Sequence, residues 1–66
     1  MTVEELIELL SGLDKKTLVV LDGYEGGLRD CTDVEKISMI MNVNTVWYYG
    51  PHEESSEGNV TAYRLR

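Results

Sequence analysis

A chain of only 66 residues that carries a single cysteine has few ways to stabilise a fold. A domain of this size buries about 60% of the surface that its unfolded chain exposes, so its margin of stability is thin. Cys31 has no second cysteine with which to form an intrachain disulfide. Together with His52 it also falls short of the roughly four ligands that close a structural zinc site. Self-association is the remaining means of stabilisation, so we expect residues 1–66 to form one small domain that pairs as a homodimer.

The charge of the chain narrows the class of partner. Twelve acidic residues stand against six basic ones, which gives a net charge of −6. Proteins that bind nucleic acid gain most of their affinity from Lys and Arg, so direct binding to DNA or RNA is not expected, and anionic membranes are disfavoured for the same reason. An acidic surface suits a basic patch on a protein partner. The alternative is that the charge only keeps a small domain in solution.

The distribution of apolar residues and the single cysteine indicate the cellular compartment in which the protein is expected. The chain opens without the basic segment and apolar run of a secretory signal. No apolar stretch approaches the ~20 residues that span a bilayer. A lone free cysteine is typical of a reducing compartment, and we expect a cytoplasmic protein.

The opening segment predicts a helix over residues 3–11. Thr2 is placed as the N-cap, and Glu5 completes a capping box three residues later. The apolar residues recur with the spacing of one buried helical face, at Val3, Leu6, Ile7 and Leu10. Gly12 is placed as the left-handed residue that ends the helix.

The remaining chain predicts strands. Apolar or alternating patterns favour strands at 17–21, 34–43 and 59–65, while 45–49 reads as either a short strand or the start of a loop. The expected fold is therefore α+β, with the helix packed on a small antiparallel meander of three to four strands. The predicted core consists of Leu6, Ile7, Leu10, Leu18, Val20, Ile37, Met39, Met41, Val60 and Leu65.

Two long connections hold most of the residues that are unusual for so small a chain. They span residues 22–33 and about 44–58, and connections of this length are usually functional or disordered. The candidate binding residues all lie in them: Asp22, Tyr24, Glu25, Arg29, Trp47, Tyr48, Tyr49, His52 and Glu53.

The first connection, DGYEGGLRDCTD, allows three interpretations. Its glycines could let backbone amides approach a phosphate, or they could simply occupy turn positions with positive φ. The spacing is not that of a phosphate-binding loop, and neighbouring carboxylates would repel an anion. The connection has the length of an EF-hand loop, but Tyr24 and Gly26 stand where oxygen ligands are required. We therefore expect no metal and no cofactor, and the alternative is a looser divalent-cation site that uses Asp22, Asp30 or Glu53.

Catalytic machinery is not recognisable in the sequence. Cys31 and His52 form the one available thiol–imidazole pair, and cysteine chemistry requires the base within hydrogen-bonding distance. Nothing in the sequence places the two residues together. We therefore expect a binding protein rather than an enzyme.

The aromatic run Trp47-Tyr48-Tyr49 is the clearest candidate contact surface. Aromatic residues of these types are enriched in interface hot spots, and they also stack on nucleotide bases. Alternation along a strand would place Tyr48 opposite to its two neighbours. The expectation is that one ring belongs to the core and another to a contact surface.

Two strings within this chain resemble a known family. DGYEGG at 22–27 and WYYGPHE at 47–53, with the opening TVEELIELLSGL, are similar to very small proteins encoded by tailed phages and prophages. The chain departs from that pattern at Leu28-Arg29. The resemblance implies an accessory protein acting in the cytoplasm of an infected bacterium, and it supplies no catalytic or binding residues.

Two functions follow as hypotheses. The first is an inhibitor that binds a host protein, such as a defence component, through its acidic surface and exposed aromatic residues. The second is an oligomeric sponge for a nucleotide-like signal, in which Tyr24, Trp47 or Tyr48 would stack on a base and Arg29 would face phosphate. A pocket of that kind would need two copies of the chain.

Overall fold

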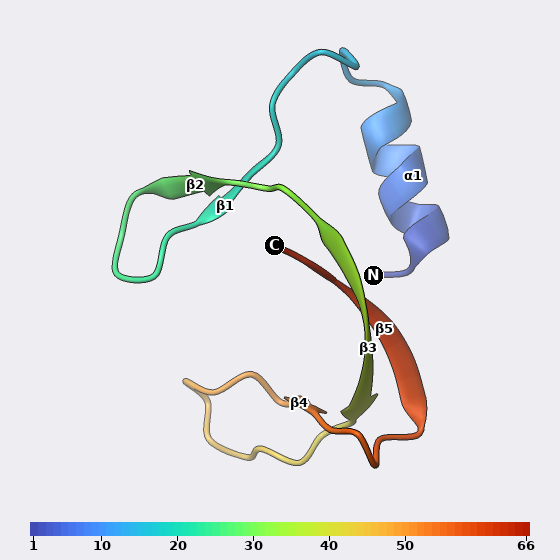
Figure 1. Cartoon of the computed structure of the whole chain (residues 1–66), viewed down its shortest axis with the longest axis vertical. Helices are drawn as coiled ribbons and strands as arrows, with labels where there is room; N and C mark the ends of the chain where they lie inside the picture. The colour runs from blue at the N-terminus through green and yellow to red at the C-terminus, as the bar shows by residue number, and fades with distance from the viewer. The chain divides into compact units, whose positions relative to one another are not determined.

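The computed structural model describes all 66 residues, and it confirms the α+β class. The chain divides into two compact units, Met1–Asp30 and Cys31–Arg66. The first unit contains the helix α1 and a two-stranded antiparallel sheet, and the second contains a three-stranded antiparallel sheet (Figure 1). In chain order the elements are α1 (Val3–Ser11), β1 (Val20–Asp22), β2 (Leu28–Asp30), β3 (Val34–Ile40), β4 (Glu53–Glu54) and β5 (Val60–Leu65).

The helix has the bounds that the sequence predicts. The Thr2 hydroxyl accepts from the Glu5 amide at 3.1 Å, and the Glu5 carboxylate accepts from the Thr2 amide at 3.0 Å. This reciprocal box satisfies free N–H groups of the first turn. The prediction for Gly12 is wrong: its φ is −88°, and the chain leaves the helix by a tight turn in which the Leu13 amide donates to the Leu10 carbonyl at 3.0 Å. A right-handed turn of this kind requires no positive φ.

The first connection contains a strand that the sequence analysis missed. The predicted strand at 17–21 begins only at Val20, and β2 folds back on it in the register Val20↔Asp30 to Asp22↔Leu28. The turn depends on glycine, because Gly27 has a φ of 68° and a Cβ at Gly23 would lie 2.2 Å from the Gly26 carbonyl oxygen. The turn interpretation of these glycines is therefore the one that the structure supports.

The second unit is built around β3. This strand lies between β4 and β5, and its ladder with β5 runs from Val34↔Leu65 to Met39↔Val60. The expected single meander is therefore replaced by two separate sheets, and the second has the order β4-β3-β5. The strand predicted over 34–43 ends at Ile40, because Asn42 adopts a left-handed conformation with φ 55°.

Only one face of the second sheet is partly covered. Glu35, Ile37 and Met39 of β3 are half-buried on the same face as Val60 and Ala62 of β5, and the β3 residues that alternate with them are exposed. The alternation predicted over 34–43 is thus confirmed for Ile37 and Met39, whereas Met41 and Val43 of the same predicted face lie beyond the strand and are exposed. Because β4 and β5 extend the same layer as β3, the other face of this sheet is left open within the unit.

Neither unit contains a fully buried residue. Of the predicted core, Leu6, Ile37, Met39 and Val60 are half-buried. The other predicted core residues are exposed: Ile7, Leu10, Leu18, Val20, Met41 and Leu65. The prediction of a closed core is wrong for these residues, because single layers of two or three strands cannot enclose side chains from both faces. The structure also contains no helix with the length and apolar character needed to cross a membrane.

Candidate binding surface on the loop between β3 and β4

The connection from β3 to β4, here called the aromatic loop (residues 41–52), is closed at its base by backbone hydrogen bonds. The amides of Val43 and Asn44 both donate to the Pro51 carbonyl, at 2.8 and 3.1 Å. The Asn42 amide donates to Nδ1 of His52 at 3.0 Å. These contacts join residues seven to ten positions apart in the chain, so the loop is ordered by its own groups.

The side chain of Asn44 ties the loop a second time. Its Nδ2 donates to the Gly50 carbonyl at 2.7 Å and to Oε1 of Glu53 at 2.8 Å. An asparagine amide nitrogen carries two N–H donors, so this one side chain can bond to both Gly50 and Glu53 on the returning side of the loop. Asn44 was not among the residues predicted from the sequence to belong to a binding site. The signal that was present is an asparagine in the middle of a long polar connection, where such side chains commonly bond to nearby backbone.

The loop presents all three aromatic side chains to solvent. Residues 46–49 form a turn in which the Tyr49 amide donates to the Val46 carbonyl at 3.2 Å, so no strand forms at 45–49. Trp47 is 93% exposed, Tyr48 69% and Tyr49 58%. The expectation that one of these rings belongs to the core is therefore wrong, because a turn replaces the strand alternation on which it was based.

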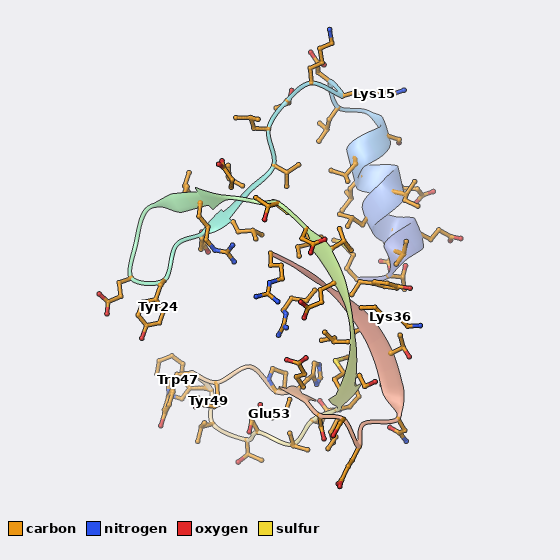
Figure 2. All side chains as sticks on the ribbon, viewed as in Figure 1. Lys15, Tyr24, Lys36, Trp47, Tyr49 and Glu53 are labelled. Carbon is orange, nitrogen blue, oxygen red and sulfur yellow. The ribbon has the colours of Figure 1, made fainter.

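Tyr48 packs against both of its neighbours, Trp47 and Tyr49. The Trp47 and Tyr48 centroids are 5.6 Å apart with an interplanar angle of 90°, and those of Tyr48 and Tyr49 are 6.2 Å apart at 79°. Both pairs have the edge-to-face geometry that aromatic rings favour. Figure 2 shows Trp47 and Tyr49 on the loop, with Glu53 nearer the point where the chain returns to the sheet.

Two of the predicted binding residues hold the loop in place. His52 accepts a hydrogen bond through Nδ1, which assigns its proton to Nε2 in the neutral ring. Glu53 accepts from Asn44. The structure therefore brings Trp47, Tyr48 and Tyr49 together at the tip of the loop, while His52 and Glu53 support the loop at its base.

A cluster of ion pairs joins β5 to β3 and β4, the two strands between which the loop runs. Arg64 of β5 pairs with Glu35 of β3, directly opposite in the ladder, and with Glu54 of β4 at 3.1 Å. Arg66 also donates to Glu35. The side-chain hydrogen bonds from Arg64 and Arg66 hold the pKa of Glu35 below its ordinary value, and the bonds to Glu35 and Glu54 raise the pKa of Arg64.

The candidate residues of the first unit lie on the β1–β2 hairpin. Tyr24, at the tip, is 99% exposed (Figure 2), and Glu25 follows it in the turn. Asp22 and Arg29 are on opposite faces, because Asp22 lies across from Leu28 whereas Arg29 lies across from Leu21. The structure does not bring these two charges together.

The backbone of this hairpin turn is already partly occupied. The Gly23 amide donates to the Gly27 carbonyl at 3.0 Å. That amide is one of the donors on which a phosphate cradle in DGYEGG would depend. The exposed Tyr24 is therefore a better candidate contact in this hairpin than a phosphate site formed by the backbone amides.

The remaining reactive side chains do not converge. No group of three or more His, Cys, Asp or Glu side chains is arranged to hold a metal ion. Cys31 approaches the Asp33 carbonyl with its sulfur at 3.9 Å, whereas His52 is bonded to the Asn42 amide. These two residues therefore have separate partners.

Comparisons with protein-family models, with curated proteins and with solved structures find no match.

Proposed function

We propose that this protein is a small non-enzymatic phage accessory protein that inhibits a bacterial host protein, such as a defence component, by binding it through the aromatic loop. The observation that carries the proposal is the exposed cluster of Trp47, Tyr48 and Tyr49 on a loop closed by its own hydrogen bonds. The phage setting rests on the resemblance of DGYEGG and WYYGPHE to small phage-encoded proteins.

The energetics of the aromatic loop favour recognition of a protein surface. Trp and Tyr supply a large contact area with few rotatable bonds, and they dominate interface hot spots. Leaving three such rings in water forgoes the free energy that their burial would provide, at about 25 cal/mol per Å² of apolar surface. A loop that is already ordered loses little further conformational freedom on binding. These features together suit an anchor that enters an apolar pocket.

The negative charge of the chain indicates which residues should surround the apolar pocket of the partner. The protein carries a net charge of −6, and Glu57 lies with Glu53 and Glu54 in the acidic segment that follows the loop. A partner with basic residues around an apolar pocket would complement this surface. Association with such a partner should slow as salt is added, because electrostatic steering is screened.

The proposal is tested by capture from host lysate with three forms of the protein. The wild type should retain one host protein at near-stoichiometric amounts, and Trp47→Ala should weaken that complex by at least ~30-fold, since hot-spot truncations cost about 2 kcal/mol or more. Tyr24→Ala is the matched control, because it removes an equally exposed aromatic ring from the other unit.

Each alternative result is informative. Loss of the complex with Tyr24→Ala but not with Trp47→Ala would move the binding surface to the β1–β2 hairpin. Failure to retain any host protein would reject the inhibitor. Native mass spectrometry of protein taken from infected cells would then identify a bound nucleotide, the ligand expected of a sponge.

A further inference from the structure

The hydrogen-bonding pattern of the second sheet shows which backbone groups of β5 are free. Asp33 and Arg66 exchange both backbone hydrogen bonds, at 2.7 and 3.1 Å, so they form a hydrogen-bonded pair just beyond the ends of β3 and β5. In an antiparallel ladder such pairs alternate with pairs that point their backbone groups away. Arg66 is a hydrogen-bonded residue of this ladder, so the alternate residues Leu65, Tyr63 and Thr61 belong to the other kind of pair. Their N–H and C=O groups therefore point to the outer edge of β5.

This outer edge has no partner within its sheet. β5 is the last strand in the order β4-β3-β5, and it pairs with β3 alone. Natural edge strands are protected by proline, by bulges or by outward-pointing lysine. Val60–Leu65 contains none of these, and its one charged residue, Arg64, is drawn back to Glu35 and Glu54.

The open face of the sheet beside this edge carries exposed apolar side chains, together with Lys36 across from Tyr63 and Ser38 across from Thr61. Tyr63 is 54% exposed, and Leu65 and Val34, which lie across from each other, are also exposed. Thr61 and Tyr63 are residue types that favour strands. The edge is thus a regular strand whose one charged side chain is paired with Glu35 and Glu54, and it is flanked by uncovered apolar side chains in a unit without a buried residue.

We propose that a second copy of this chain pairs with the outer edge of β5, so that two three-stranded sheets join in one continuous sheet. The strands run antiparallel about a two-fold axis at Tyr63. In that register Tyr63 faces Tyr63 of the second copy and Thr61 faces Leu65, and each outward N–H and C=O of these residues meets its complement. This inference is independent of the proposed host partner.

The register follows from charge and from hydrogen bonding. A two-fold axis at Arg64 would oppose two arginines directly, which is destabilising. An axis at Ala62 would leave Leu65 of each copy without a partner inside β5. With the axis at Tyr63, Arg64 lies across from Ala62 and no like charges meet. The strand is therefore complementary to itself, which favours a second copy over an unrelated strand.

Cysteine substitution tests the register. In a Cys31→Ser background, Tyr63→Cys should give a disulfide-linked dimer under mild oxidation, because directly opposite residues of a hydrogen-bonded pair have Cα atoms about 5.5 Å apart. Thr61→Cys should not, since the two copies of residue 61 would be about 13 Å apart. The double variant Thr61→Cys/Leu65→Cys should restore the cross-link. Efficient linkage through Thr61→Cys alone would overturn the register.

Sedimentation of the full chain tests the dimer itself. The wild type and Tyr63→Thr, which keeps the backbone N–H, should both sediment as dimers. Tyr63→Pro should be monomeric, because proline removes an outward donor that the β3–β5 ladder does not use. Protection of the Ala62 and Arg64 amides from hydrogen exchange would show that the ladder survives in this variant. A wild type that is monomeric at every concentration, or a dimer that Tyr63→Pro leaves intact, would reject the proposal.

Discussion

At the scale of single residues, the side chain of Asn44 joins the two sides of the aromatic loop. It donates to Gly50 and to Glu53 from one nitrogen. Replacing it with alanine removes both contacts and leaves the aromatic rings in the sequence. The variant therefore tests the contribution of these hydrogen bonds to the order of the loop while the three aromatic residues stay in place.

We expect Asn44→Ala to loosen the aromatic loop. A hydrogen bond of this kind contributes about 1 kcal/mol, so the amides of Val43 and Tyr49 should exchange roughly fivefold faster or more. Asn59→Ala is the matched control, because no hydrogen bond of the Asn59 side chain is present in the structure. Equal exchange rates in the two variants would show that water replaces the amide without loss.

The ionisation of Glu35 makes the stability of the second sheet depend on pH. Its pKa lies below the ordinary value of 4.5 because Arg64 and Arg66 donate to its carboxylate. The resulting stability is present above the ordinary pKa, and it is lost as the pH falls through the lowered pKa. Urea unfolding at successive pH values should show this loss in the wild type.

The variant Glu35→Gln checks the assignment. It should be less stable than the wild type at neutral pH, and the difference should narrow as acid neutralises Glu35 of the wild type. Glu57→Gln serves as the control, since Glu57 makes no ion pair. A Glu35→Gln difference that stays constant down to acid pH would contradict the role of the carboxylate charge.

At the scale of elements, the β1–β2 hairpin depends on the backbone conformation of its turn. Gly27 has a φ of 68°, while Gly50 does not have a positive φ, and a Cβ at either position would enter open space. Alanine therefore meets no steric clash at either position, and only Gly27→Ala places a Cβ on a residue with positive φ. The pair isolates the conformational contribution of glycine to the hairpin.

We expect Gly27→Ala to destabilise the hairpin by about 1–2 kcal/mol, the usual cost of a left-handed conformation for a residue with a Cβ. The amides of the β1–β2 ladder should lose protection from hydrogen exchange. Gly50→Ala should leave them unchanged. Comparable effects of the two substitutions would mean that the turn adapts to alanine.

At the scale of the whole molecule, the absence of a buried residue leads us to expect that stability depends on association. A chain of 66 residues that leaves most of its predicted core exposed would gain burial from the second copy that we propose to pair with β5. Folding and pairing are then linked by mass action. The thermal midpoint becomes a property of concentration as well as of sequence.

We therefore expect the thermal midpoint to rise over about a hundredfold increase in protein concentration. Added salt should tighten the dimer, because each copy carries a net charge of −6 and salt screens the repulsion. Calorimetry at several concentrations and two ionic strengths measures both effects. A midpoint that is independent of concentration would contradict the link between folding and pairing.

Features that depend on neighbours in the chain could be predicted from the sequence. The bounds of α1 follow from a capping box whose residues are three positions apart. The half-buried face of β3 follows from alternation along a single strand, and β5 differs from its predicted start by one residue. Each of these features is determined by residues that lie within a few positions of one another. The same holds for the prediction that at least one ring of the run Trp47-Tyr48-Tyr49 is exposed.

Features that depend on pairing between distant segments were decided only by the tertiary structure. β2 and β4 are two or three residues long, and each exists because a partner strand supplies its hydrogen bonds. The closure of the aromatic loop by Asn44 and Pro51 likewise joins groups that no local pattern relates. The free outer edge of β5 has the same origin, since only the order β4-β3-β5 determines which strand is left without a neighbour.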